Sequence, residues 1–168
     1  RPRKLGILLS LLTLLRKSEL LKAEWSHIDF EKRIWLIPVT KADSKTGNSR
    51  EMVVYMSDQI IEILKELKTI AGDEPYVFVG RKSGTHFSHN AFNTSQKNAL
   101  RLTDIPDFTI HDLRRTASTH LNEQGFNRDA IEKCLNHSAF GVRAVYNKAE
   151  YAEERKDMMQ KWSNFIFS

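Results

Sequence analysis

The feature that most constrains this chain is a leucine-rich apolar run over residues 5–15, with a basic residue directly before it and another directly after it. The run is too short to cross the hydrocarbon core of a bilayer, which takes about 20 residues. No small-residue cleavage site follows it, so it does not match a secretory signal either. We therefore expect a helix buried in the core of a globular domain, and no membrane segment.

Composition places the chain among ordinary globular domains. Of its 168 residues, 40% are hydrophobic and 28% are charged, which is enough apolar material for one sizeable core. The formal charge of +5 permits a polyanionic partner without identifying one. Cys134 is the only cysteine, which excludes an intramolecular disulfide and favours a cytoplasmic setting. Because an apolar helix pattern starts almost at Arg1, we also expect a fragment of a longer protein.

The hydrophobic pattern predicts an α+β fold that is mainly α-helical, with a small antiparallel three-stranded sheet. Short apolar runs predict strands at residues 28–30, 34–38 and 52–55, and a polar, basic loop over residues 41–50 joins the last two. Helical spacing of apolar residues predicts helices over residues 5–25, with an end or bend at Arg16, and over 58–71, 88–102, 110–125, 128–135, 142–149 and 151–165.

Several predicted helices carry end signals. Ser57 is a suitable N-cap, and Gly72 a suitable stop, for the helix between them. Thr109 and Asp112 match a capping box, in which a hydroxyl and a carboxylate satisfy free backbone N–H groups. Asn127 precedes the next helix in the same way as Ser57. We therefore expect helices to begin directly after these N-cap residues.

His111 and Arg114 lie in the first turn of the helix that starts after Thr109. Residues three apart share one face of a helix, and the first turn presents unpaired N–H groups and the positive end of the helix dipole. An imidazole and a guanidinium at this place suit a phosphate ligand. His-x-x-Arg also occurs by chance in many surface helices. Similarly, Glu19 is placed to hold the side chain of Arg16, but the two also fit a plain helical ion pair.

Taken together with three further residues, these pairs resemble the tyrosine recombinases, the family of phage-type integrases. The family pattern is an arginine in a leucine-rich helix followed by a glutamate, a lysine in a β-hairpin, His-x-x-Arg, a later histidine and then a tyrosine. The stretch over residues 111–151 especially resembles prophage and genomic-island integrases. This chain supplies the pattern in order, as Arg16, Glu19, Lys45, His111, Arg114, His137 and Tyr146.

Two places in the chain depart from the family pattern. Leu14 and Leu15 stand where the family often has a glycine near the first arginine, and Asn136 stands where the family has a glycine before the later histidine. Asparagine is the residue after glycine that best tolerates a left-handed backbone. We therefore expect Asn136 to keep the turn.

The resemblance implies the DNA breaking-rejoining fold of an integrase catalytic core, as one domain over residues 1–168 without the N-terminal DNA-binding domains. It implies site-specific DNA recombination, the integration and excision of a mobile element such as a prophage, through a 3′-phosphotyrosyl intermediate and without metal, ATP or another cofactor. The alternatives are a topoisomerase of type IB and a non-catalytic DNA-binding remnant. The complete set of family residues argues against a remnant.

The resemblance also assigns chemical roles. Arg16 and Arg114 suit neutralisation of the non-bridging phosphate oxygens, because guanidinium groups match their geometry. Tyr146 is the nucleophile, and because an unperturbed tyrosine has a pKa of about 10, it needs a base, for which His111 is the candidate. The 5′ oxygen leaves poorly unless it is protonated, and Lys45 on a flexible hairpin suits that task.

Other residues support these roles or compete for them. His137 suits a hydrogen bond to a non-bridging oxygen. Lys41 lies in the same loop as Lys45, but Lys45 falls nearer the expected hairpin tip and is followed by Thr and Gly as in the family. Tyr151 is a second tyrosine near His137, but it begins an amphipathic helix and fits a packing role better.

The implied partner is double-stranded DNA that carries attachment sites. Recombinases of this family assemble as tetramers on paired sites, so we expect a tetramer on DNA and a monomer without it. The helix expected at residues 151–165 is the candidate to pack either on a neighbour or on its own domain. The residues expected to contact DNA are Arg115, Lys41, Lys97 and Arg101.

Three further groups receive structural interpretations. His86 and His89 lack a third ligand at metal-site spacing, so we expect solvated loop histidines and no metal site. Cys134 falls on the apolar face of its helix and is expected to be buried and unreactive. Tyr55 and Tyr76 lie in strand-like runs and are expected in the core.

Overall fold

The structure is a computed structural model that describes residues 1–38, 51–101, 104, 106–136 and 151–168. Lys41, Lys45, His137 and Tyr146, and the helix expected at residues 142–149, lie outside the described residues. In chain order the elements are α1 (Pro2–Thr13), α2 (Lys17–Leu21), a 3-10 turn (Trp25–His27), β1 (Ile28–Asp29), β2 (Ile34–Ile37), β3 (Met52–Tyr55), α4 (Asp58–Ala71), α5 (His89–Leu100), α6 (Ile110–Glu123), α7 (Arg128–Cys134) and α9 (Ala152–Ile166).

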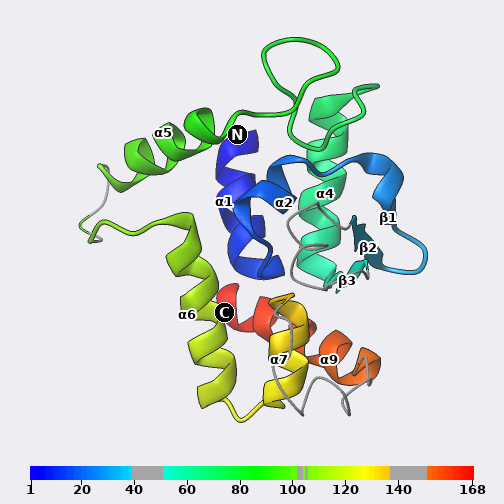
Figure 1. The fold of residues 1–168 in the computed structure, drawn as a ribbon, viewed down its shortest axis with the longest axis vertical. Helices are drawn as coiled ribbons and strands as arrows, with labels where there is room; N and C mark the ends of the chain where they lie inside the picture. The colour runs from blue at the N-terminus through cyan, green and yellow to red at the C-terminus, as the bar shows by residue number, and fades with distance from the viewer. Residues whose placement is uncertain (39–50, 102–103, 105, 137–150) are drawn as a thin grey trace, which may run out of the picture.

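Helix α1 is the centre of the helical part of the molecule. It contacts α2, α4, α5, α6 and α9 (Figure 1). Leu9 and Leu12 are fully buried. Gly6 lets α5 approach closely, because a Cβ atom there would lie 2.7 Å from the ring of Phe92. The prediction that the apolar run forms a buried helix is confirmed.

The sheet is antiparallel, in the order β1-β2-β3, so β2 is its central strand. Trp35 of β2 pairs with Ile28 on one side and Val54 on the other. Burial alternates along β2 and β3, which places Trp35, Ile37 and Val54 in the core. The three predicted strands are confirmed, and each starts at its predicted residue.

The predicted helix starts are also confirmed. The hydroxyl of Ser57 accepts a hydrogen bond from the main-chain N–H of Ile60 at the start of α4. The side-chain oxygen of Asn127 accepts one from Asp129 at the start of α7. Gly72 ends α4 with a positive φ of 61°, which glycine adopts more easily than any other residue.

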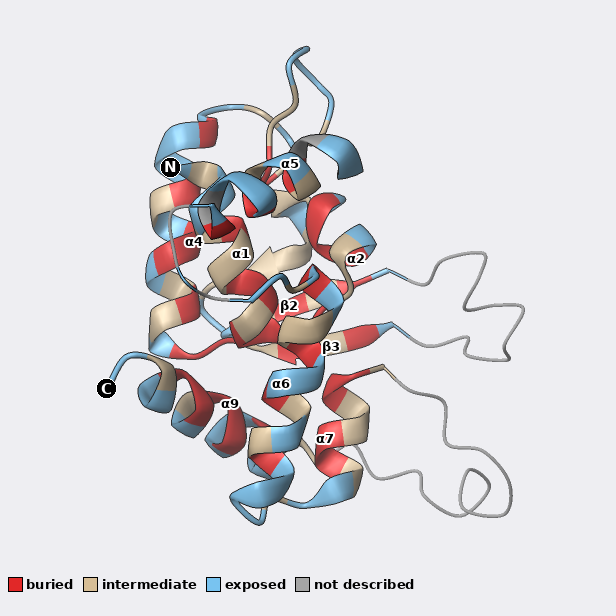
Figure 2. Cartoon of the chain, turned by 90° about the vertical axis from the view of Figure 1, so that its left-hand side faces the viewer, coloured by how far each residue is buried: buried red, intermediate tan, exposed pale blue. Residues whose placement is uncertain are grey.

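The C-terminal helix α9 packs on its own domain, which is one of the two placements expected from the sequence. Met158 and Trp162 are fully buried, and Trp162 Nε1 donates to the carbonyl of Leu11 at 3.0 Å. The hydroxyls of Ser57 and Ser163 lie 2.7 Å apart and join α9 to the start of α4. Figure 2 shows the row of buried residues along α9.

Ile70 and Phe165 keep the apolar spacing of the helices predicted over residues 58–71 and 151–165, but both are about half exposed. Ile70 is 48% exposed because Ala71, one turn after Leu67, takes the inward position at the end of α4. Phe165 is 47% exposed and lies at the end of α9, where its ring stacks on Trp162 with centroids 5.8 Å apart. Within the described residues, no helix combines the length and the apolar character needed to cross a membrane.

Candidate active site

The corner between α1 and α2 places Arg16. Leu14, directly after α1, has φ at 59°, a left-handed conformation that costs a non-glycine residue about 1–2 kcal/mol. Its side chain is fully buried, which offsets this strain. The chain then turns, and Arg16 becomes the N-cap of α2. The helix end predicted at Arg16 is confirmed, and a leucine rather than a glycine makes the turn.

Glu19 holds Arg16 in two places. Its carboxylate oxygens accept one hydrogen bond from the main-chain N–H of Arg16, at 2.7 Å, and one from Nη1, at 2.8 Å. The Glu19 side chain is only 4% exposed, whereas that of Arg16 is 39% exposed. A buried carboxylate with two N–H donors is a stronger support than a solvated surface ion pair. The guanidinium is therefore anchored at its base and still accessible.

Arg114 reaches the same corner from α6. It is 3% exposed, and its Nη1 and Nη2 donate to the main-chain carbonyls of Leu14 and Leu135. Burial, and after it the positive charge of Arg16, lowers the pKa of Arg114 to about 10. Arg114 therefore stays charged at neutral pH while it lies next to a second cation. An anion bound beside both guanidinium groups would relieve that repulsion.

The end of α7 brings the two guanidinium groups together. Arg16 Nη2 donates to the carbonyl of Asn136 at 3.2 Å, and Arg114 Nη2 donates to that of Leu135, the preceding residue. The last carbonyls of a helix lack partners within the helix and carry the negative end of its dipole, so they suit cationic donors. Asn136 has φ at 48°, which confirms that it keeps the turn in a left-handed conformation.

The first turn of α6 presents His111. The capping box is confirmed: the Thr109 hydroxyl accepts from the N–H of Asp112 at 3.3 Å, and Asp112 accepts from the N–H of Thr109 at 2.9 Å. Hydrogen bonds from the side chain and main chain of Thr109 hold the pKa of Asp112 below its usual value. His111 is exposed on this fixed turn, one turn before the buried Arg114.

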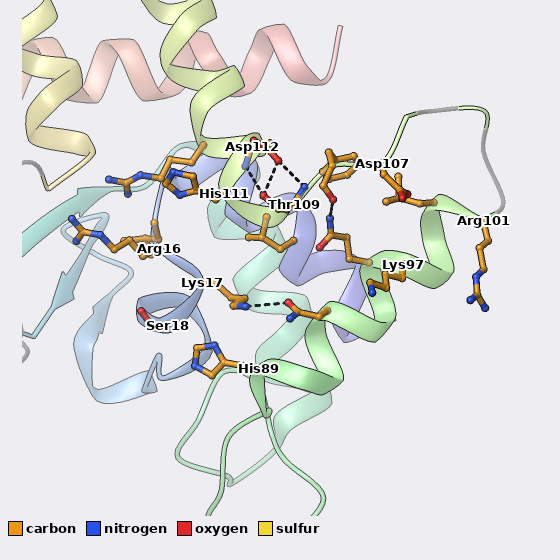
Figure 3. A pocket seen from close by; sticks show the side chains of 17 residues that line it. Arg16, Lys17, Ser18, His89, Lys97, Arg101, Asp107, Thr109, His111 and Asp112 are labelled. Atoms are coloured by element: carbon orange, nitrogen blue, oxygen red, sulfur yellow. Dashed lines mark hydrogen bonds between the residues drawn. The ribbon is translucent and has the colours of Figure 1, made fainter.

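A cleft of about 920 Å³ opens between α2, α5 and the start of α6. Arg16, His111 and Arg114 line it, and Figure 3 shows Arg16 and His111 side by side. Lys97 and Arg101 line the cleft farther along α5, away from this group. Arg16, His111 and Arg114 thus form a place for one phosphate group. Lys97 and Arg101 extend the positive charge of the cleft lining away from it, and we call these two residues the cationic wall of the cleft.

Sequence reasoning missed three residues of this cleft. Lys17, His89 and Asn93 also line it, and Lys17 Nζ donates to the side-chain oxygen of Asn93 at 3.0 Å. Burial, followed by the charge of Lys17, lowers the pKa of His89. A signal was present in the sequence: His89, Asn93 and Lys97 stand four residues apart and so share one face of α5, and Arg101 continues this spacing directly after the helix.

The structure brings together four of the predicted site residues and adds two of the predicted DNA contacts to the same cleft. Arg115 is exposed, lies outside the cleft lining, and has its Nη1 3.7 Å from the carboxylate of Asp112. Lys41, Lys45, His137 and Tyr146 lie outside the described residues. The predicted residues that line the cleft or support it are Arg16, Glu19, His111, Arg114, Lys97 and Arg101.

Some structural interpretations need correction. His86 is half-buried, with its ring 5.4 Å from that of Tyr76, so it is not solvated as expected. His89 is exposed as expected, but it begins α5 and does not lie in a loop. Tyr55 and Tyr76 are half-buried rather than core residues. Cys134 is buried as expected, and burial raises the pKa of its thiol.

Comparison with known proteins agrees with this geometry. The model of the phage integrase family matches residues 2–153. Among curated proteins, the chain is 35% identical to prophage integrase IntA of Escherichia coli (strain K12), over 93% of this chain and 37% of that protein. It is 34% identical to the integrase of Enterobacteria phage P4, over 97% of this chain and 40% of that protein. The chain therefore spans less than half the length of these relatives.

Solved structures share the fold at low sequence identity. The integrase from mycobacterium phage Brujita superposes with a TM-score of 0.71 at 18% identity, covering 96% of this chain and 51% of that one. The XerH site-specific recombinase, solved bound to difH substrate in a pre-cleavage complex, superposes with a TM-score of 0.67 at 18% identity, covering 90% of this chain and 45% of that one. The chain belongs to the phage integrase family and has the catalytic-domain fold of tyrosine recombinases.

Proposed function

We propose that this chain is the catalytic domain of a site-specific DNA recombinase that integrates and excises a mobile element. The observation that carries the proposal is the pair of guanidinium groups, Arg16 and Arg114, fixed on consecutive carbonyls at the end of α7 beside His111. Two adjacent cations held by neutral carbonyls and one buried carboxylate form a preorganised site for a phosphodiester. Family membership supports the same activity.

In the proposed cleavage step, the phenol oxygen of Tyr146 bonds to phosphorus and the bond from phosphorus to the 5′ oxygen breaks. His111 takes the phenol proton, and Lys45 gives a proton to the leaving 5′ oxygen. Arg16 and Arg114 stabilise the negative charge on the non-bridging oxygens. The products are a 3′-phosphotyrosyl protein and a free 5′ hydroxyl. Attack by the 5′ hydroxyl of another strand reverses every bond change, so no external energy source is needed.

His137 fits a hydrogen bond to a non-bridging oxygen, because it directly follows Asn136, whose carbonyl holds Arg16. The proposed DNA path runs along α5, where Lys97 and Arg101 continue the cationic wall of the cleft. Lys17 adds a further cation beside it. Phosphate contacts of this kind set affinity and register without reading sequence.

We further propose a tetramer on paired DNA sites, a monomer without DNA, further DNA-binding domains in the complete protein, and a cytoplasmic location in a bacterial cell. The length of the two curated relatives supports the additional domains, since this chain covers 37% of one and 40% of the other. The pre-cleavage complex of XerH with difH substrate supports a double-stranded DNA partner.

A nicked suicide substrate, which loses its 5′ hydroxyl fragment after cleavage, tests the proposal. The complete natural protein should accumulate a covalent adduct with this DNA. The Tyr146→Phe protein should form none, and the matched Tyr151→Phe protein should form it normally. A covalent adduct in the Tyr146→Phe protein, or no adduct in the unmodified protein, would contradict the proposal.

The alternative function, a type IB topoisomerase, is not favoured, because the family model and the curated relatives are integrases. Two DNA duplexes that carry the same site separate the two functions. A recombinase exchanges strands between the duplexes and yields products of new length, whereas a topoisomerase only relaxes supercoiled DNA.

A further inference from the structure

Lys17, the first residue of α2, lines the cleft directly after Arg16 and has no part in the bond changes described above. It is half-buried, and its Nζ donates to the side-chain oxygen of Asn93 on α5 at 3.0 Å. Figure 3 shows Lys17 between Arg16 and α5. An ammonium has several N–H donors and no acceptor, so the bond to Asn93 leaves donors for a ligand in the cleft.

The partner of Lys17 is neutral, which distinguishes it from other lysines of the chain. Among the described residues, Lys17 forms no ion pair with a carboxylate. By contrast, the ammonium groups of Lys32, Lys156 and Lys161 each lie within 3.2 Å of a carboxylate oxygen. An amide oxygen fixes the direction of a lysine side chain without cancelling its charge. Lys17 is thus an oriented cation that an anion in the cleft would neutralise.

The surroundings of Lys17 in the cleft are also short of negative charge. The two carboxylates among the described cleft-lining residues, Asp107 and Asp112, lie near the start of α6 and not beside Lys17 (Figure 3). Asp112 is already held by Thr109 in the capping box. His89 lies close enough to Lys17 that, after burial, the charge of Lys17 is the next cause that lowers its pKa. This part of the cleft therefore favours an anion.

The position of Lys17 next to Arg16 suits a second phosphate of the same DNA strand. Consecutive Cα atoms are about 3.8 Å apart, and one strand of B-form DNA carries a phosphate about every 3.4 Å along the helix axis. In Figure 3 the side chain of Arg16 lies beside His111, whereas that of Lys17 is turned toward α5. Lys97 and Arg101 lie farther along in the same direction. Lys17 thus stands between the place for the first phosphate and the cationic wall.

We propose that Lys17, held by Asn93, binds one of the two phosphates that directly flank the scissile phosphate on the cleaved strand. The inference rests on the proposed function, because only cleavage defines a scissile phosphate. A contact to the flanking phosphate fixes the register of the strand, so that the scissile phosphate meets Arg16 and Arg114 in the reacting position. Asn93 is a positioning residue in this arrangement, since it holds the ammonium in place.

Removal of single phosphate charges isolates this contact. A methylphosphonate, in which a methyl group replaces one non-bridging oxygen, is neutral and is placed at either flank of the scissile phosphate in the suicide substrate. In the complete natural protein at limiting concentration, Lys17→Met should lower the rate of adduct formation on ordinary DNA by about ten-fold or more, as expected for a hydrogen bond to a charged group. When one particular flank is neutral, the Lys17→Met and unmodified proteins should react equally fast. When the other flank is neutral, the difference between them should remain.

Three further proteins serve as controls. Lys17→Gln loses the charge but keeps an N–H donor for Asn93; it should show the same selective loss, and it decides the question if Lys17→Met fails to fold. Asn93→Ala should lower the rate by about three-fold, and only where the same flank is charged. Lys65→Met removes an equal charge from an exposed position of α4 outside the cleft lining, and should leave the rate on each DNA unchanged.

The outcomes separate this inference from the function on which it rests. If the rates of the Lys17→Met and unmodified proteins are equal on ordinary DNA, Lys17 binds no phosphate that matters for cleavage, and the inference is overturned. A difference that persists with either flank neutral would also overturn it, and would show that the pair with Asn93 only joins α2 to α5. If the unmodified protein forms no adduct with any of these DNAs, the proposed function fails and the inference fails with it.

Discussion

Two buried arginines meet the end of α7, and they differ in what surrounds them. Arg114 comes from α6, lies next to a second cation, Arg16, and also lines the cleft. Arg155 comes from α9 and contacts a strand carbonyl, a thiol and an aromatic ring. Both are almost completely buried, at 3% and 2% exposed. Burial alone therefore does not distinguish a ligand-binding arginine from a structural one.

The informative feature of the Arg114 site is the repulsion between its two guanidinium groups. The charge of Arg16 helps to lower the pKa of Arg114, so the folded protein holds two like charges together before any ligand is bound. Such an arrangement is unfavourable for stability and becomes favourable when an anion binds. The contacts of Arg155 are satisfied within the protein. We therefore interpret the site of Arg114 as preorganised for phosphate, and Arg155 as a structural residue that connects elements of the fold.

The largest effect is expected for Arg114→Ala. Cleavage should fall by about 10²–10³-fold, the usual cost of losing one preorganised donor to the transition state. The carbonyls of Leu14 and Leu135 would also lose their donor, and the free energy of unfolding should fall by about 1–3 kcal/mol. Adduct rates and chemical denaturation measure the two effects. Replacing the scissile 5′ oxygen by sulfur, which leaves without protonation, should not restore the rate, because Arg114 stabilises the phosphate and not the leaving group. Recovery on the sulfur substrate would contradict this role.

Glu19→Gln should have the next largest effect. The amide keeps the shape of the carboxylate but not its charge, so the two bonds to Arg16 weaken. Hydrogen bonds to charged groups contribute about 1.5–3 kcal/mol, which predicts a loss of about ten-fold or more in adduct rate. The matched surface change is Asp157→Asn, whose partner Lys161 is 2.9 Å away in an exposed pair. It should alter unfolding by less than about 0.5 kcal/mol. If Glu19→Gln and Asp157→Asn change the adduct rate and the free energy of unfolding by the same amounts, Glu19 is an ordinary ion-pair residue.

Asn136 tests the turn on which the two cleft arginines converge. Asn136→Ala should destabilise the fold by about 1 kcal/mol, because alanine tolerates the left-handed conformation poorly. Asn136→Gly should be nearly neutral in stability, since glycine adopts that conformation freely. Thermal unfolding of the two proteins measures the difference. The same stability in both would show that the left-handed turn does not matter.

The smallest effect is expected at the cap of α6 and depends on pH. The pKa of Asp112 is lowered in the folded protein, so its stabilising contribution is fully present above the ordinary carboxyl pKa and is lost as the pH falls through the lowered value. Asp112→Asn should therefore be less stable than the unmodified protein at neutral pH and equally stable in strong acid. Denaturation at both pH values checks this, and a difference that persists in acid would contradict the assigned cause.

The sequence predicted the parts of the site that depend on local chemistry. The capping box at Thr109, the helix end at Arg16 and the left-handed Asn136 all follow from the preferences of single residues. The carbonyl partners of Arg114 could not be predicted, because Leu14 and Leu135 are far apart in sequence and meet only through packing. The same is true of Lys17 with Asn93 and of Arg155 with Val53. Long-range contacts of this kind have no pattern within one segment.

The half-buried histidine and the exposed Ile70 show the limits of pattern reasoning in another way. His86 was expected to be solvated because no third metal ligand accompanies it, but an isolated bridge between Val79 and His86 brings it against Tyr76. Ile70 keeps the apolar spacing of α4, but Ala71 takes the inward position at the end of the helix and leaves Ile70 about half exposed. Whether an apolar residue is buried depends on the neighbouring element as well as on its own helix.

The central claim is that Tyr146 attacks a phosphodiester held by Arg16 and Arg114. The most direct measurement is mass spectrometry of the peptide that remains linked to DNA after a suicide substrate is cleaved and the adduct is digested with protease. The account predicts a nucleotide phosphate on Tyr146, with the DNA attached through its 3′ end. A phosphate on Tyr151 or on any other residue, or a linkage through the 5′ end, would contradict it.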